Sequence, residues 1–113
     1  MIQLPQSVNI YFYSVNDGEP YKFLTAFDEH AYVRDNRREF NGKDAIANWS
    51  KTEIFDVKVQ YEITNAWEQD DHYFVTASVD GEFDKTNLPD PFLMKHKFKL
   101  INGQIKELYV TFA

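Results

Sequence analysis

Three side chains in the sequence could together perform acid–base chemistry: the carboxylate of Asp35, the phenol of Tyr11 and the imidazole of His96. A carboxyl group that aromatic neighbours partly desolvate has its pKa raised toward values useful for proton transfer. A phenol or an imidazole N–H in an apolar site can donate a preorganised hydrogen bond to an oxygen that gains negative charge. These residue types therefore indicate proton transfer, provided that the fold brings them together.

Each of the three also has a purely structural explanation. Asp35 precedes Asn36, and aspartate is a good residue to start a hairpin turn. Tyr11 lies on an apolar helical face, where a tyrosine is often a core residue whose hydroxyl bonds to backbone or water. His96 could equally be a histidine of the core with its hydrogen bonds satisfied. The sequence leaves these alternatives open.

Large apolar side chains are candidates for the walls of a cavity around these groups. The candidates are Phe12, Phe27, Trp49, Met94 and Phe98. Together they would suit a flat, ring-shaped hydrophobic ligand, although plain core packing explains any one of them as well.

The spacing of apolar residues predicts helices in the first part of the chain. Leu4, Val8, Tyr11, Phe12 and Val15 share one helical face, and the run 16–18, Asn-Asp-Gly, is a stop signal. A second short helix follows Pro20, with Phe23, Leu24 and Phe27 as its apolar stripe. Two short strands, 31–35 and 38–40, are joined by a tight turn, and a third helix spans about 43–54.

Beyond Phe55 the apolar period falls from 3.6 to 2, which predicts long strands. On the strand around His96, the side chains of Phe92, Met94, Phe98 and Leu100 share its inward parity. Asn102-Gly103 is a hairpin turn. We therefore predict an α+β fold in which three N-terminal helices pack on a curved antiparallel sheet of about four long strands plus a short hairpin, leaving a cone with an open end.

Composition excludes several classes of function. The 113 residues carry a net charge of −6, which argues against nucleic-acid binding. There is no cysteine, so disulfides and thiolate chemistry are excluded. The three histidines lack metal-binding spacing, and no glycine pattern cradles a phosphate, so we expect no metal and no cofactor. With no membrane-length apolar run and no secretion signal, we expect a single cytoplasmic domain over 1–113 with no membrane association.

Five segments in order along the chain resemble the nuclear-transport-factor-2-like superfamily, in particular SnoaL-like polyketide cyclases and ketosteroid isomerases. The resemblance covers roughly Pro5 to Phe112. The matching segments are Tyr11–Asn16 with Gly18, Phe27–Asp35, Phe40–Ile46, Val79–Asp84, and Phe98–Leu100 followed by Asn102–Ile105.

The resemblance implies roles for the three chemical residues. Asp35 matches the general base of ketosteroid isomerases, and Tyr11 matches their oxyanion-stabilising tyrosine. His96 stands where those enzymes carry a protonated aspartate that donates a hydrogen bond. This departure puts steroid isomerase activity in doubt, because a histidine could donate, pair with Asp35 or bind an acidic ligand instead.

Two functions follow from these observations. One is a cofactor-independent isomerase or cyclase in which Asp35 abstracts a proton next to a carbonyl group while Tyr11 and His96 stabilise the enolate oxygen. The other is a non-catalytic ligand-binding or dimerisation module, since the fold hosts both. On either hypothesis the resemblance implies a homodimer through the outer sheet face, where we expect Tyr73, Phe74 and Leu93.

Overall fold

The computed structural model describes residues 2–113, which form three α-helices, one π-helical turn and a single six-stranded sheet. In chain order the elements are α1 (Gln6–Asp17), α2 (Pro20–Thr25), β1 (Phe27–Asp35), β2 (Arg38–Asn41), α3 (Gly42–Ser50), the π-helical turn Lys51–Phe55, β3 (Gln60–Gln69), β4 (His72–Asp80), β5 (Leu93–Ile101) and β6 (Gln104–Phe112). The predicted α+β class, with three helices, a short hairpin and four long strands, is confirmed.

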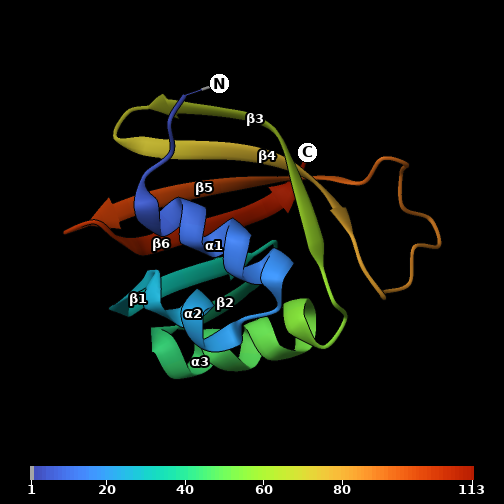
Figure 1. Cartoon of the computed structure of the whole chain (residues 1–113), viewed down its shortest axis with the longest axis horizontal. Coiled ribbons are helices and arrows are strands. Elements are labelled where there is room, and N and C mark those ends of the chain that lie inside the picture. Colours follow the sequence, from blue (N-terminus) through green and yellow to red (C-terminus); the bar gives the residue numbers. More distant parts are fainter. Residues whose placement is uncertain (1) are drawn as a thin grey trace.

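The sheet curves around the helices, which all lie on its concave face (Figure 1). Its strand order is β2-β1-β6-β5-β4-β3, and every neighbouring pair is antiparallel except β1 with β6. Helix α1 crosses the concave face, and the segment between β4 and β5 extends beyond the body of the sheet at one end (Figure 1). A concave sheet covered by helices on one side is the predicted cone.

Side chains along β5 point alternately into the cone and to the outer face of the sheet. His96 and Phe98 are fully buried, whereas Lys95 and Lys99 are exposed on the outer face. Because side chains point to opposite faces with a period of two, the inward position of His96 follows directly from its neighbours. The register places His96 beside Val75 of β4 and Val110 of β6.

Two helix boundaries differ from the sequence-based prediction. Phe27 belongs to β1 and not to the stripe of the second helix, because the chain pairs with β6 at this point and the N–H of Ile105 donates to the carbonyl of Ala26 at 2.8 Å. The third helix is α-helical only to Ser50 and continues as the π-helical turn. At Phe27, pairing with a distant strand outweighs the local helical pattern.

One side chain ties α1 to the sheet. Asn16 accepts a hydrogen bond from the N–H of Tyr61 through Oδ1 at 2.7 Å, and its Nδ2 donates to the carbonyl of Tyr61 at 2.9 Å. Tyr61 is the second residue of β3, pairs with Val79 and faces the concave side, so this clamp fixes the backbone at the wall of the cone.

Replacing Asn16 by alanine removes both hydrogen bonds and leaves two backbone groups of an edge strand without their partner. We expect Asn16→Ala to lower the free energy of unfolding by about 1–3 kcal/mol. Chemical denaturation measures the effect, and Asn48→Ala, at an exposed position of α3, is the matched control with little expected change. Equal stabilities for the two variants would show that the clamp contributes nothing.

Candidate functional site

The Asp35 carboxylate lies at the end of β1, held by donors on one of its two oxygens. Oδ2 accepts from Arg38 Nη2 at 2.8 Å and from Trp49 Nε1 at 3.1 Å. Oδ1 has only a long contact, 3.4 Å, with the side-chain amide of Asn36. Its side chain is 14% exposed. Oδ2 is therefore fixed by charge and hydrogen bonding, whereas Oδ1 makes no shorter contact with a donor of the described residues.

Arg38 is itself shared between two carboxylates. Its Nη1 donates to Glu53 at 2.6 Å, and Glu53 and then Asp35 raise the pKa of the guanidinium further above its usual value. The pair with Asp35 is therefore a persistent charge contact at the rim of the cone.

A cavity of about 270 Å³ opens beside Asp35 at the mouth of the cone. Its floor and walls come from both layers of the fold, and the side chains around it are mainly apolar. They include Val57, Val59, Tyr61, Val79, Phe83, Phe92, Met94, Val110 and Phe112. A cavity of about 150 Å³ can hold benzene, so this one has room for a substituted ring.

Tyr11 and His96 lie deeper, inside the aromatic core. Their ring centroids are 5.8 Å apart, and both side chains are fully buried. The Tyr11 hydroxyl and both imidazole nitrogens of His96 have no hydrogen-bond partner among the described residues. An unpaired buried polar group costs about 1–3 kcal/mol. The hydroxyl of Ser7 is the fourth buried side-chain atom of this kind among the described residues.

Burial sets the protonation state of both residues. Desolvation lowers the pKa of His96 to about 4, and the nearby backbone at Val75 and Met94 opposes the shift only in part. The imidazole is therefore neutral at pH 7 and carries one N–H donor. Burial also raises the pKa of Tyr11 well above 10, with further contributions from the Tyr61 phenol and the Asp35 carboxylate.

Tyr61 separates the mouth from this buried pair. Its ring is stacked on Tyr11 with centroids 6.2 Å apart and stands edge-on to His96 at 5.2 Å. Burial and the charge of Asp35 raise the pKa of Tyr61 to about 12. The two phenols influence each other electrostatically, although their hydroxyls do not meet the geometry of a hydrogen bond.

The structure thus brings Tyr11 and His96 together and places Asp35 at the mouth, on the other side of Tyr61. Among the predicted ligand-contacting residues, only Met94 lines the mouth cavity. Phe12, Phe27 and Phe98 are packed in the core, and Trp49 is buried with its indole N–H on Asp35. The sequence did not single out Tyr61 as a site residue. The alternation of apolar and polar residues along β3 could have indicated that its side chain points into the cone.

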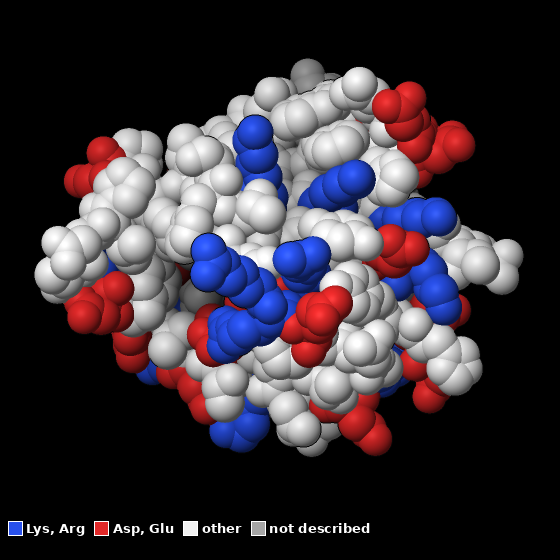
Figure 2. Space-filling model, turned by 180° about the vertical axis from the view of Figure 1, so that it is seen from behind, with Lys and Arg blue, Asp and Glu red and all other residues white. Residues whose placement is uncertain are grey.

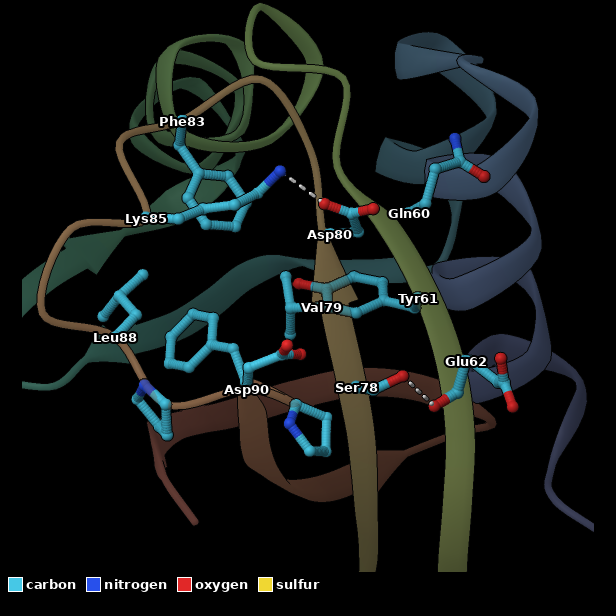
Figure 3. Close-up of a pocket in the computed structure, with 13 residues that line it drawn as sticks. Gln60, Tyr61, Glu62, Ser78, Val79, Asp80, Phe83, Lys85, Leu88 and Asp90 are labelled. Atoms are coloured by element: carbon cyan, nitrogen blue, oxygen red, sulfur yellow. Dashed lines mark hydrogen bonds and ion pairs between the residues drawn. The ribbon is translucent and has the colours of Figure 1, made fainter.

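A second hollow, of about 670 Å³, adjoins the mouth and shares Tyr61, Val79, Phe83 and Phe92 with it. The segment between β4 and β5 forms its outer wall, and Figure 3 shows Phe83, Lys85 and Leu88 of this segment facing the strands. Lys85 is bound to Asp80 at 2.7 Å (Figure 3). Tyr61 therefore has open space on two sides.

Within residues 2–113, no three His, Asp or Glu side chains are grouped so that they could hold a metal ion. None of the helices described is both long enough and apolar enough to cross a membrane.

The buried, neutral His96 makes stability depend on pH. The pKa in the folded state, about 4, lies below the ordinary 6.5, so the unfolded chain binds the proton more readily. The stability from neutral His96 is complete above pH 6.5 and is lost as the pH falls toward 4. We expect His96 to account for a loss of about 2 kcal/mol between pH 7.5 and pH 5, measured by denaturation at each pH.

The control compares wild type with His96→Leu, which should lose this part of the pH dependence, and with exposed His30→Leu, which should keep it. Hydrogen bonds lower the pKa of Asp28, Asp80 and Asp84, so their protonation destabilises the fold only at more acidic pH and does not interfere. An unchanged pH profile in His96→Leu would contradict the account of His96.

Comparisons with known proteins bear on the fold. No protein-family model and no curated protein matches the sequence. The chain is similar in structure to a putative polyketide cyclase from Sinorhizobium meliloti, with a TM-score of 0.84, 24% identity and coverage of 96% of this chain and 95% of the other. An NTF2-like protein of unknown function from Cytophaga hutchinsonii has a TM-score of 0.76 and 13% identity, with 100% and 95% covered.

The Δ5-3-ketosteroid isomerase of a Mycobacterium species is also similar, with a TM-score of 0.74, 13% identity and coverage of 95% of this chain and 90% of the isomerase. Identities of this size establish a shared architecture, while function depends on the site that each chain carries. The chain therefore has the nuclear-transport-factor-2-like fold of polyketide cyclase-like and ketosteroid isomerase-like proteins.

Proposed function

We propose that the protein binds a small cyclic carbonyl compound at the mouth of the cone and transfers a proton on the carbon next to the carbonyl. The observation that carries this proposal is the asymmetric environment of Asp35. Two donors fix Oδ2, whereas Oδ1 has only the long contact with Asn36 among the described residues, and Asp35 lines the mainly apolar mouth cavity. A base must be held in place and still be accessible to the proton that it removes.

In the proposed step, Asp35 takes a proton from the carbon, and the electron pair of that C–H bond moves to form an enolate. The negative charge develops on the ligand oxygen, where a hydrogen-bond donor in a water-poor site is most effective. Tyr11 and neutral His96 are the proposed donors. Return of the proton to a different carbon would give an isomer, without any cofactor.

The names of the structural neighbours support the same class of chemistry. The names describe a putative cyclase of polyketides and an isomerase of ketosteroids. The size of the mouth cavity, about 270 Å³, favours a ligand of one ring or a fused pair.

A non-catalytic ligand-binding role is the second candidate. It is favoured by the closed interior, in which Tyr11 and His96 have no access to the mouth, and by the ion pair that engages Asp35 with Arg38. In this case the same cavity would hold the ligand without changing it.

Deuterium exchange separates the two candidates. We expect the protein to accelerate exchange of the α-protons of cyclohexanone and cyclohex-2-enone in D₂O, followed by proton NMR. Asp35→Asn should lower the accelerated rate by about 100-fold or more, because general-base catalysis contributes about 10² to 10⁴.

The matched control is Asp44→Asn, an exposed aspartate in the first turn of α3, which should leave the rate unchanged. The indole N–H resonance of Trp49, bonded to Asp35, reports occupancy of the mouth, and that of Trp67 serves as reference. A shift at Trp49 without any exchange would favour the non-catalytic role.

We further propose that two copies meet through the outer face of the sheet. Figure 2 shows this side of the molecule, where several lysines and arginines and some acidic side chains lie among uncharged surface. Trp67 and Phe74 are stacked there at 5.2 Å, and the Lys97 ammonium lies over the rings of Phe74 and Tyr109. Tyr73 does not belong to this face as expected from the sequence, because its side chain packs against the core; Phe74 and Trp67 form the aromatic centre.

Sedimentation velocity tests this proposal. We expect a species of twice the 13.4 kDa chain mass, and we expect Phe74→Glu to produce monomers, because it places a charge in the desolvated centre of the contact. Glu68→Gln, at an exposed position of the neighbouring edge strand β3, should remain dimeric. A wild-type monomer at micromolar concentration would refute the dimer.

A further inference from the structure

The Tyr61 side chain lies between two sites that the proposed chemistry needs to connect. On one side it borders the mouth cavity that contains Asp35. On the other side its ring touches Tyr11, His96 and Phe12, the last with centroids 5.3 Å apart and the rings nearly perpendicular. No other side chain of the mouth makes ring contacts with both Tyr11 and His96 among the described residues.

The atoms behind this ring are unpartnered. The hydroxyl of Tyr11 and both nitrogens of His96 are buried and make no hydrogen bond with the described part of the chain. Buried polar groups of native proteins are nearly always paired, so an unpaired set needs an explanation. The rings that carry these atoms are neighbours, with centroids 5.8 Å apart, and the ring of Tyr61 contacts both of them and also lines the mouth cavity.

The backbone of Tyr61 is fixed, whereas its side chain has space to move. Asn16 binds both the N–H and the carbonyl of Tyr61, at 2.7 and 2.9 Å. The ring borders the mouth cavity and also the neighbouring hollow of about 670 Å³. Figure 3 shows the side chain projecting from β3 toward Val79 of β4, at the edge of that hollow. A change to another staggered χ1 rotamer would move the ring without disturbing the strand.

We infer that Tyr61 is a gate whose side chain swings out of the cone so that a ligand ring takes its place and bonds through one neutral oxygen to Tyr11 and His96. The inference rests on the proposed function and adds a residue that determines specificity. Because a phenol ring now fills the position, the matching ligand is a single six-membered ring with one hydroxyl or keto oxygen. A charged head group would be excluded, since the surroundings are apolar rings.

The test removes the Tyr61 ring by substitution and adds an equivalent ring as a free molecule. Tyr61→Ala leaves a space that 4-methylphenol, the side chain of tyrosine as a free molecule, can fill. We expect 4-methylphenol to bind this variant at least tenfold more tightly than it binds wild type, by calorimetry. Unlike the ring of Tyr61, the free 4-methylphenol molecule is not attached to β3, so its hydroxyl can move toward Tyr11 and His96. Toluene has no oxygen to bond to them and should bind the variant at least tenfold more weakly than 4-methylphenol.

The ¹⁵N resonances of the His96 ring report whether the probe reaches the buried pair. They should shift when 4-methylphenol saturates Tyr61→Ala, while those of His30 and His72 stay fixed. Tyr73→Ala, which removes another inward tyrosine that borders neither cavity, is the matched control and should bind as wild type does. Tyr61→Leu gives the same test, with a smaller expected gain, if the alanine variant does not fold.

The wild-type protein provides a readout that needs no substitution. At saturating 4-methylphenol, a gate that opens lets the His96 resonances shift together with the indole resonance of Trp49. A shift at Trp49 alone would overturn the gate and leave ligand binding at the mouth intact. Equal affinities of 4-methylphenol and toluene for Tyr61→Ala, or unchanged His96 resonances in that variant, would also overturn it.

Discussion

The arrangement of this protein depends on the desolvation of two polar side chains, Tyr11 and His96, within an apolar core. Burial keeps the imidazole neutral and the phenol protonated, so both groups can donate a hydrogen bond and neither carries a charge at pH 7. A fold of 113 residues has little stability to spare. The Tyr11 hydroxyl and the two His96 nitrogens are buried with no hydrogen-bond partner in the described part of the chain. This is costly for such a protein, and a ligand that bonds to them would recover part of that cost.

The position of Asp35 complements this interior. Trp49 and Arg38 bind one carboxylate oxygen and hold it at the rim, where the charge is close enough to raise the pKa of both Tyr11 and Tyr61. Proton transfer beside a carbonyl needs a base and, at a separate place, hydrogen-bond donors for the oxygen. Here the carboxylate lies at the mouth, near water, and the neutral donors lie in the interior, away from water. Tyr61 stands between these two parts.

Most of the fold could be predicted because its signals are periodic. The alternation around His96 predicted its inward direction, and Asn102-Gly103 predicted the last hairpin, in which both residues adopt positive φ. The end of the second helix could not be predicted, since Phe27 is drawn into β1 by a parallel partner in β6, far along the chain. Local spacing carries no information about that pairing.

The candidate site was predictable as a set of residues but not as an arrangement. The neighbouring residues in the sequence were enough to single out Asp35, Tyr11 and His96. Whether another ring lies between them depends on packing across three strands and a helix. Trp49 illustrates the limit: it was expected to contact a ligand, and its indole N–H is instead bonded to Asp35. Tyr61 shared its inward parity with other residues of β3, and only the contacts of its ring distinguish it.

In the proposed function, the neutral pair Tyr11 and His96 binds the ligand oxygen behind Tyr61. A crystal structure of the protein grown at pH 7 with cyclohex-2-enone tests it most directly. We expect the ketone oxygen within hydrogen-bond distance of the Tyr11 hydroxyl and a ring nitrogen of His96, with the Tyr61 ring moved away from Tyr11 into the neighbouring hollow. A ketone found only beside Asp35, with Tyr61 still stacked on Tyr11, would contradict it.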